Sequence, residues 1–154
     1  MTAVPPPAAA TRLVLVVDDD AQVRALLARW ATIAGHTAVV AVDGRDALDS
    51  FARHPGIEAV ITDVRMPGID GFALLEWIRE QRPKLVARTF FITGDAGSRD
   101  MNKRLELLGV PVLRKPFKME SLLQQCQQLL AAQTAAPMSA APPENGRLAY
   151  AAAN

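Results

Sequence analysis

The chain contains 154 residues, half of them hydrophobic, and carries a formal net charge of +1. This length suits one compact α/β domain, and the balanced charge gives no general attraction to nucleic acid, membranes or acidic partners. The single cysteine, Cys126, excludes a disulfide within the chain and favours a reducing compartment. The longest early apolar run, residues 13–17, is too short to span a bilayer, and the N-terminus shows no secretion signal, so we expect a cytoplasmic protein.

Short apolar runs alternate along the chain with longer amphipathic segments. The runs are rich in β-branched residues and predict strands covered on both faces, at residues 13–17, 37–42, 57–62, 89–92 and 110–113. The alternation predicts five βα units, which build a parallel sheet with helices on both faces.

The segments between the runs have the periodicity of amphipathic helices. One face of the first helix would carry Val23, Leu26, Leu27, Trp30 and Ile33. One face of the last would carry Leu122, Leu123, Cys126, Leu129 and Leu130. Predicted N-caps are Asp20, Asp43, Asp70 and Ser98, and predicted helix stops are Gly35 and residues 54–56.

The two ends of the chain differ in composition from this central region. Residues 1–10 and 131–154 are rich in Ala and Pro and poor in large apolar side chains. We interpret them as a disordered lead and a flexible tail. The predicted domain is residues 11–130, and the remaining length is too short for a separate output domain.

Polar side chains follow four of the predicted strands. Asp18 and Asp19 follow the first strand and Asp63 follows the third. Thr93 follows the fourth strand and Lys115 follows the fifth. Because functional groups of open parallel sheets gather at the carboxyl ends of the strands, we expect these side chains to share one site.

The types of these residues predict phosphoryl chemistry. Neighbouring carboxylates repel one another unless a cation separates them, and oxygen ligands favour Mg²⁺, or alternatively Mn²⁺, over Zn²⁺. A carboxylate can attack phosphorus when the charge on the phosphoryl oxygens is neutralised. Asp63 is the predicted nucleophile, with Asp18 and Asp19 as metal ligands. Thr93 and Lys115 would contact the remaining phosphoryl oxygens.

Each of these residues also has a simpler structural explanation. Capping of the following helix explains Asp20 fully, and Asp18 and Asp19 could be caps or loop charges as well. Lys115 alone could be an exposed loop charge, and Thr93 alone could be a strand former. Their joint placement at four strand ends favours the functional interpretation.

Four segments resemble the receiver domains of bacterial response regulators. They are residues 16–20 (VVDDD), 61–71 (ITDVRMPGIDG), 91–95 (FITGD) and 113–117 (LRKPF). The resemblance extends over about residues 11–130. It implies a doubly wound, flavodoxin-like (βα)5 fold of three layers, with the strand order 2-1-3-4-5.

The resemblance also implies roles for single residues. Asp63 would be the phosphoacceptor. Asp19, Asp63 and the Arg65 backbone carbonyl would bind Mg²⁺, with Asp18 acting largely through water. Thr93 and Lys115 would sense the phosphoryl group, and the peptide bond between Lys115 and the following proline would be cis.

A member of this family is a regulatory phosphoacceptor rather than an enzyme. The resemblance implies a histidine kinase or a histidine phosphotransfer protein as phosphoryl donor, and a downstream protein as target. The balanced charge and the lack of a basic stripe predict no nucleic acid or membrane partner, and the resemblance leaves open a homodimer through the fourth and fifth helices. With no output domain expected, we predict a stand-alone receiver.

The chain departs from the family at one position. An aromatic side chain often lies three residues before the lysine, where this chain has Val112. An aromatic switch coupled to Thr93 is therefore excluded there, and the pattern is reminiscent of receivers attached to hybrid kinases. Arg65 and Asp95 border the site and could pair with each other, or both could be solvated surface charges. On the fourth helix, we expect a solvated basic face formed by Arg99, Lys103 and Arg104, which a kinase or target could also use.

Three other functions are disfavoured by the same residues. A phosphatase with an aspartyl-phosphate intermediate usually has a second Asp two residues after the nucleophile, where this chain has Arg65. A flavodoxin-like ligand-binding module requires a phosphate loop after the first strand, where this chain has acids. An inactive receiver would lack one of the expected site residues, and none is missing.

Overall fold

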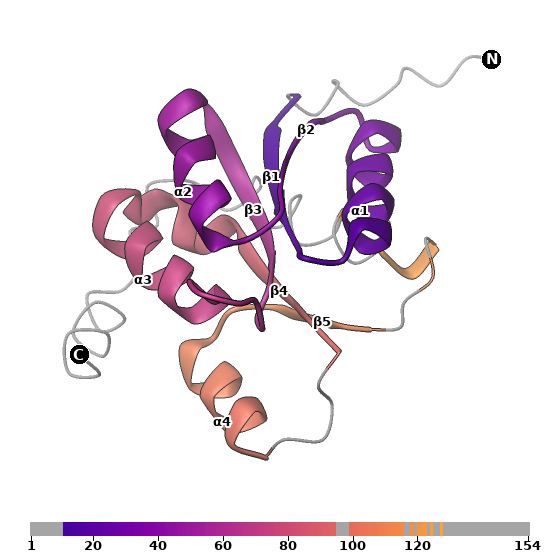
Figure 1. The fold of residues 1–154 in the computed structure, drawn as a ribbon. Coiled ribbons are helices and arrows are strands. Elements are labelled where there is room, and N and C mark those ends of the chain that lie inside the picture. The colour runs from indigo at the N-terminus through magenta and orange to yellow at the C-terminus, as the bar shows by residue number, and fades with distance from the viewer. Residues whose placement is uncertain are drawn as a thin grey trace.

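The computed structural model describes residues 11–94, 99–115, 118, 120–122, 124 and 127 (Figure 1). Five parallel strands form one sheet in the order β2-β1-β3-β4-β5, which confirms the predicted topology. The strands are β1 (Leu13–Val17), β2 (Thr37–Ala41), β3 (Ile57–Asp63), β4 (Thr89–Thr93) and β5 (Val112–Arg114). The helices are α1 (Ala21–Ile33), α2 (Gly44–Arg53), α3 (Gly71–Gln81) and α4 (Arg99–Leu108), with the 3₁₀ helix η1 (Pro83–Arg88) before β4.

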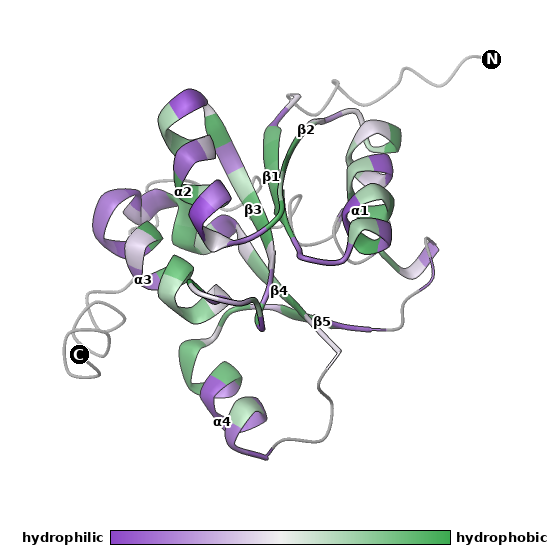
Figure 2. Ribbon diagram, viewed as in Figure 1, coloured by the Kyte–Doolittle hydropathy of each residue, from purple (hydrophilic) through white to green (hydrophobic). Residues whose placement is uncertain are grey.

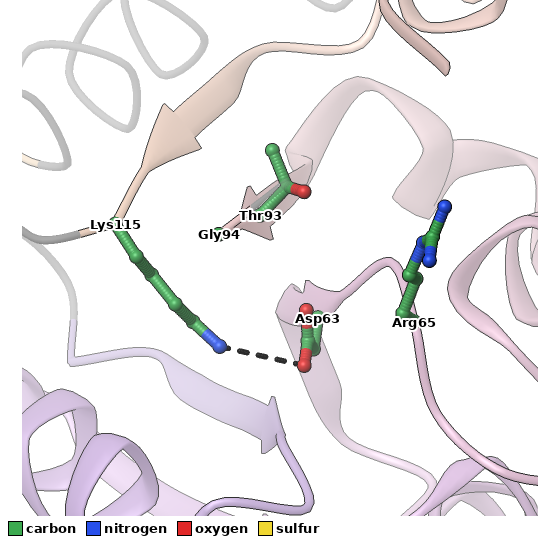
Figure 3. Close-up of a pocket in the computed structure, with 5 residues that line it drawn as sticks. All are labelled: Asp63, Arg65, Thr93, Gly94 and Lys115. Carbon is green, nitrogen blue, oxygen red and sulfur yellow. Dashed lines mark hydrogen bonds and ion pairs between the residues drawn. The ribbon is translucent and has the colours of Figure 1, made fainter. Parts of the chain in front are cut away.

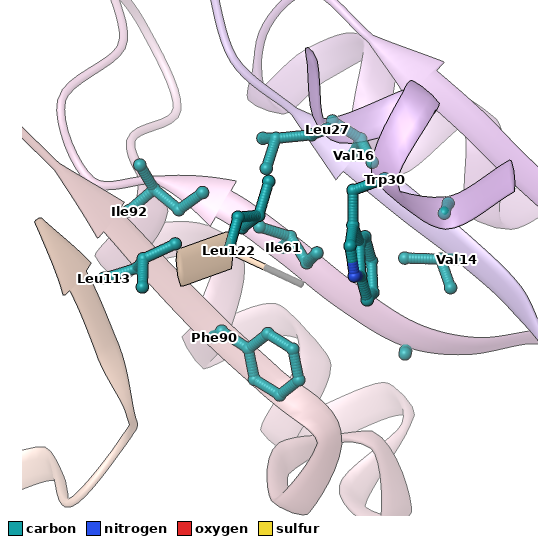
Figure 4. Packing of buried hydrophobic residues seen from close by; sticks show 11 residues of the cluster. Val14, Val16, Leu27, Trp30, Ile61, Phe90, Ile92, Leu113 and Leu122 are labelled. Atoms are coloured by element: carbon teal, nitrogen blue, oxygen red, sulfur yellow. The ribbon is translucent and has the colours of Figure 1, made fainter. Parts of the chain in front are cut away.

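Side-chain alternation along β1 explains why helices cover both faces of the sheet. Val14 and Val16 pack with Leu27 and Trp30 of α1 (Figure 4). Leu15 and Val17 belong to the cluster on the opposite face, together with side chains from α2 and α3. Because successive strand residues point to opposite faces, an unbroken run of apolar residues needs cover on both sides. Figure 2 shows the central strands largely hydrophobic, whereas the helices mix hydrophobic and hydrophilic residues.

Three aspartates cap the N-termini of helices, as predicted. The carboxylate of Asp20 accepts hydrogen bonds from the backbone N–H groups of Gln22 and Val23. The Asp43 and Asp70 carboxylates cap α2 and α3 in the same way. These caps place helix starts directly beyond the carboxyl ends of β1, β2 and β3.

The ends of several elements differ from the prediction. The last strand begins at Val112 rather than at residue 110, because Pro111 has no N–H to donate to the sheet, although its carbonyl accepts from the Phe91 N–H at 2.9 Å. Ile33, expected on the buried face of α1, is 55 % exposed. It is the last residue of the helix, and the chain turns away at Gly35, which has a φ of +87°.

The predicted last helix is described only in part. Residues 120–122, 124 and 127 are helical, and Leu122 is fully buried in the cluster that contains Trp30. Leu123, Cys126, Leu129 and Leu130, as well as the expected cap Ser98, lie outside the described residues. Among the described residues, no helix combines the length and apolar composition needed to cross a membrane.

Candidate functional site

A pocket opens at the carboxyl edge of the sheet, beyond the ends of β3, β4 and β5. Its lining residues are Asp63, Arg65, Thr93, Gly94 and Lys115 (Figure 3). The strand order reverses between β1 and β3, since β2 lies on one side of β1 and β3 on the other, and Asp63 at the end of β3 lines the pocket. The site is therefore at the topological switch point of the sheet, where open α/β folds bind their ligands.

Three carboxylates meet beside this pocket. One oxygen from each of Asp18, Asp19 and Asp63 lies within 4.8 Å of the others. Asp18 is fully buried and Asp63 is 7 % exposed, whereas Asp19 is exposed. The structure thus brings together the three acids that the sequence placed at the ends of β1 and β3.

Lys115 is the cation that faces these acids. Its Nζ lies 3.0 Å from Asp18 Oδ2 and 3.4 Å from Asp63 Oδ2. The contact with Asp18 is an ion pair, and Asp18 Oδ2 accepts no hydrogen bond of standard geometry from the described residues. Asp18 and Asp63 share this ammonium and Asp19 adds a third carboxylate beside them, so carboxylates are in excess over the ammonium that contacts them.

The pKa values of Asp63 and Lys115 reflect this excess of carboxylates. Burial, followed by repulsion from Asp18, raises the pKa of Asp63 from 3.8 to about 6, although Lys115 acts in the opposite direction. Burial alone would lower the pKa of Lys115, but the carboxylates of Asp18 and Asp63 outweigh it and raise that pKa. A second cation in the pocket would favour the ionised form of Asp63 and therefore its nucleophilic form.

Thr93 and Arg65 complete the pocket from two other segments. Thr93 is the last residue of β4 and is buried, and its carbonyl accepts a hydrogen bond from the Lys115 N–H at 2.8 Å. Figure 3 shows Lys115 and Arg65 on opposite sides of Asp63. The predicted pairing of Arg65 with Asp95 and the predicted cis bond before Pro116 involve residues outside the described part of the chain.

Two residues that support the site, Arg24 and Gly71, were not predicted from the sequence. Arg24 Nη1 donates to the backbone carbonyl of Asp18 at 2.8 Å. A Cβ at Gly71 would lie 2.5 Å from the Asp63 carbonyl oxygen, so only glycine lets the start of α3 approach the end of β3 so closely. A basic residue one helical turn after an acidic cap makes Arg24 a candidate, but its contact with Asp18 depends on the angle between strand and helix.

Arg104 is exposed as expected, but it also makes a contact that the sequence did not predict. Arg104, expected on a solvated face, has its guanidinium carbon 3.8 Å from the centre of the Phe72 ring. Phe72 in turn makes an edge-on contact with Phe91 of β4, with ring centres 5.6 Å apart. Arg104 therefore joins α4 to α3 through a cation–π contact.

Comparisons with known proteins agree with this geometry. The family model of the response regulator receiver domain matches residues 14–127. The transcriptional regulatory protein TcrA of Mycobacterium tuberculosis is 34% identical over 116 residues, which are 75% of this chain and 45% of that protein. The regulator of RpoS of Escherichia coli is 37% identical over 108 residues, which are 68% of this chain and 30% of that protein. The chain thus spans less than half the length of these relatives.

Solved structures of similar size have the same fold. The chemotaxis protein CheY4 of Vibrio cholerae is 29% identical, with a TM-score of 0.68 over 78% of this chain and 99% of that one. The receiver domain of the hybrid histidine kinase CckA is 31% identical, with a TM-score of 0.62 over 77% of this chain and 98% of that one. Because the family model spans most of the sequence and the fold is shared, this chain belongs to the response regulator receiver domains of two-component signalling.

Proposed function

We propose that this receiver accepts a phosphoryl group on Asp63 and changes its protein contacts as a result. The observation that carries the proposal is the position of Asp63, a buried carboxylate 3.4 Å from an ammonium and within 4.8 Å of two further acids. A purely structural ion pair needs no third carboxylate and no open pocket beside it. A cation from outside the chain would offset the repulsion among these three carboxylates.

The donor set fits a hard divalent cation, Mg²⁺ or Mn²⁺. The proposed ligands are Asp19, Asp63 and the Arg65 carbonyl, with Asp18 acting largely through water. Asp18 supports this assignment, because its buried Oδ2 atom shares the Lys115 ammonium with Asp63 and accepts no hydrogen bond of standard geometry from the described residues. When bound, the cation supplies positive charge against one phosphoryl oxygen and against the repulsion among the acids.

The chain's own residues perform the remaining steps. An Asp63 carboxylate oxygen forms a bond to phosphorus while the bond from phosphorus to the leaving group breaks, and that group departs with its electron pair. Lys115 Nζ and the Thr93 hydroxyl each donate to a phosphoryl oxygen, which stabilises the charge that develops there. Their strands pair with β3 and with each other in the order β3-β4-β5, so the phosphoryl contacts would span three neighbouring strands.

The phosphoryl donor in this proposal is a histidine kinase or a histidine phosphotransfer protein. The output is a change in affinity for a protein target, or onward transfer of the phosphoryl group. Val112 supports an output without an aromatic rotamer switch, because a half-buried valine at this position has no ring to rotate toward Thr93. A homodimer through the fourth and fifth helices is part of the same proposal and is tested by the oligomeric state with and without phosphorylation.

The phosphoacceptor is tested by intact-mass measurement after incubation with acetyl phosphate and Mg²⁺. We expect the wild-type protein to gain the mass of one phosphoryl group and the Asp63→Asn variant to gain none. Asp49→Asn, which removes an exposed aspartate of α2, is the matched control and should behave as the wild type. An unchanged mass of the wild-type protein would count against the proposal.

Signalling beyond the phosphoryl transfer is tested at Lys115. The Lys115→Ala variant should still gain the phosphoryl mass, but phosphorylation should no longer alter hydrogen exchange in β4 and α4. Lys84→Ala removes an exposed lysine of η1 as a control and should retain the wild-type exchange response. Equal exchange in the wild-type protein before and after phosphorylation would contradict the switching part of the proposal.

A further inference from the structure

Asp19, the exposed acid of the site, lies between two peptide groups whose orientation is restrained by hydrogen bonds. Asp18 and Asp63 are held by burial, whereas the side chain of Asp19 is exposed. The carbonyl of the preceding peptide group, Asp18 O, accepts a hydrogen bond from Arg24 Nη1 at 2.8 Å. The N–H of the following peptide group, from Asp20, donates to Asp18 Oδ1 at 2.8 Å. Both peptide planes that determine the direction of the Asp19 side chain are therefore fixed by hydrogen bonds.

The position of Arg24 in its helix explains how it reaches the end of β1. The helix α1 begins at Ala21, and the Arg24 N–H makes the first helical bond, to Asp20 O, at 3.0 Å. Side chains of a helix tilt toward its N-terminus, so the guanidinium extends back over the first turn to the strand end. The other side of the turn is fixed by the Asp18 N–H, which donates to Ala41 O of β2 at 3.2 Å.

We infer that Arg24 is a positioning residue for the metal site, because it fixes the peptide between Asp18 and Asp19 and so directs the Asp19 carboxylate toward the cation. This inference rests on the proposed function, since it concerns the proposed Mg²⁺ ligand Asp19. Without Arg24, the buried carbonyl of Asp18 would lack this donor, and the peptide would rotate to find another. Rotation of that peptide would move the Asp19 carboxylate away from Asp18 and Asp63.

The charge of Arg24 has the opposite effect on metal binding. A guanidinium near the site repels a divalent cation, so loss of the charge alone would tighten Mg²⁺ binding. Loss of the hydrogen bond that orients Asp19 would weaken it. The sign of the change therefore separates a positioning role from a purely electrostatic one.

The experiment is a Mg²⁺ titration by isothermal calorimetry of the wild-type chain and three variants. Outer-shell partners of metal ligands typically contribute tenfold or more to affinity, so Arg24→Met should weaken Mg²⁺ binding roughly tenfold. Arg24→Lys keeps a donor and the charge and should recover most of the affinity. Arg29→Met removes an exposed arginine of the same helix and should leave the dissociation constant unchanged. Unchanged or tighter binding by Arg24→Met would overturn the inference.

A double-mutant cycle identifies Asp19 as the residue through which Arg24 acts. In an Asp19→Asn background, Arg24→Met should change Mg²⁺ affinity less than twofold. If the full effect of Arg24→Met persists there, Arg24 does not act through Asp19, and the inference is wrong.

A metal-free measurement separates failure of the inference from failure of the proposed function. In the ¹⁵N relaxation of the metal-free protein, Arg24→Met should lower the order parameter of the Asp19 amide, and Arg24→Lys should restore it. If the wild-type chain binds no Mg²⁺, the proposed function fails, but this measurement still decides whether Arg24 orders the turn. An unchanged order parameter in a folded Arg24→Met protein would contradict the positioning role.

Discussion

Strand β1 has a buried charged side chain at each of its ends, Arg12 just before it and Asp18 just after it. At the amino edge of the sheet, Arg12 Nη1 lies 3.6 Å from Glu58 Oε2. The Arg12 N–H donates to His36 Nδ1 at 3.1 Å. At the carboxyl edge, Asp18 shares the Lys115 ammonium with Asp63, and the three-carboxylate group lies beside an open pocket.

The difference between these edges distinguishes a structural cluster from a functional site. At the amino edge, the buried Arg12 pairs with Glu58 of the same sheet, although burial and the nearby charge of Arg88 lower the pKa of Arg12. At the carboxyl edge, Asp18 and Asp63 share the Lys115 ammonium, Asp19 adds a third carboxylate, and an open pocket lies beside them. Buried charges are costly without partners, so this arrangement supports the proposed binding of a cation.

The largest expected effect is that of Mg²⁺ on stability, and it should depend only on the carboxyl edge. At a Mg²⁺ concentration of 100 times the dissociation constant, the free energy of unfolding should rise by about 2.7 kcal/mol. The rise should be largely lost in Asp19→Asn and retained in Arg12→Met. Urea unfolding with Mg²⁺ or with a chelator measures it, and a rise that survives Asp19→Asn would place the cation elsewhere.

The next effect concerns the amino edge. Arg12→Met removes the ion pair with Glu58 but keeps most of the buried stem, and the Glu58 side chain is 47% exposed and remains hydrated. We therefore expect a loss of about 2 kcal/mol in the free energy of unfolding, below the range for a fully buried pair. Phosphorylation by acetyl phosphate should be unchanged once the protein is folded. Loss of phosphorylation in a folded Arg12→Met protein would show that the two edges of the sheet do not act independently.

A smaller effect follows from the raised pKa of Asp63. In the metal-free protein this pKa is about 6 when folded, against an ordinary value of 3.8, so ionisation of Asp63 destabilises the fold as pH rises through about 6. Asp63→Asn should therefore stabilise the metal-free protein at pH ~7.5 by about 1–2 kcal/mol, an estimate reduced for solvent screening in the open pocket. The gain should shrink toward zero near pH ~3, below both pKa values, where Asp63 is largely protonated in the folded and in the unfolded protein. Urea unfolding at the two pH values, with a chelator, measures the difference, and an equal gain at both would contradict this origin.

The smallest expected effect is a loss of stability on acidification that is caused by His36. Its pH dependence is opposite in sign to that of Asp63. Burial, followed by the charge of Arg12, lowers the pKa of His36 below 6.5 in the folded protein. The contribution of this histidine to stability is thus complete above the unfolded pKa and is lost as pH falls from there through the lower folded pKa. His36→Asn can keep an acceptor for the Arg12 N–H and does not titrate, so it should lose less stability on acidification, by up to about 1 kcal/mol. Identical pH profiles of the two proteins would exclude His36 as an acid-sensitive group.

Local sequence patterns predicted the features that depend on neighbouring residues. The runs of β-branched residues predicted the strands, and the aspartates before α1, α2 and α3 predicted their caps. The rule that parallel strands end at one edge of a sheet predicted that Asp18, Asp63 and Lys115 lie together, as the structure has them.

Features that depend on tertiary contacts were not predicted. The reach of Arg24 to a backbone carbonyl and the close approach of Gly71 to Asp63 require the angle between strand and helix, which no local pattern encodes. The same holds for Arg104, whose guanidinium covers Phe72 of another helix. The 3₁₀ helix η1 was missed because its six residues are too few to show a hydrophobic period.

The most direct test of the account is to locate the phosphoryl group chemically. After incubation with acetyl phosphate and Mg²⁺, borohydride reduces an aspartyl phosphate to an alcohol, which tandem mass spectrometry of peptides assigns to one residue. We predict reduction at Asp63 alone, dependent on Mg²⁺ and absent when acetyl phosphate is omitted. Reduction at another carboxylate, or at none while the protein is folded and supplied with Mg²⁺, would contradict the assignment of Asp63 as the phosphoacceptor.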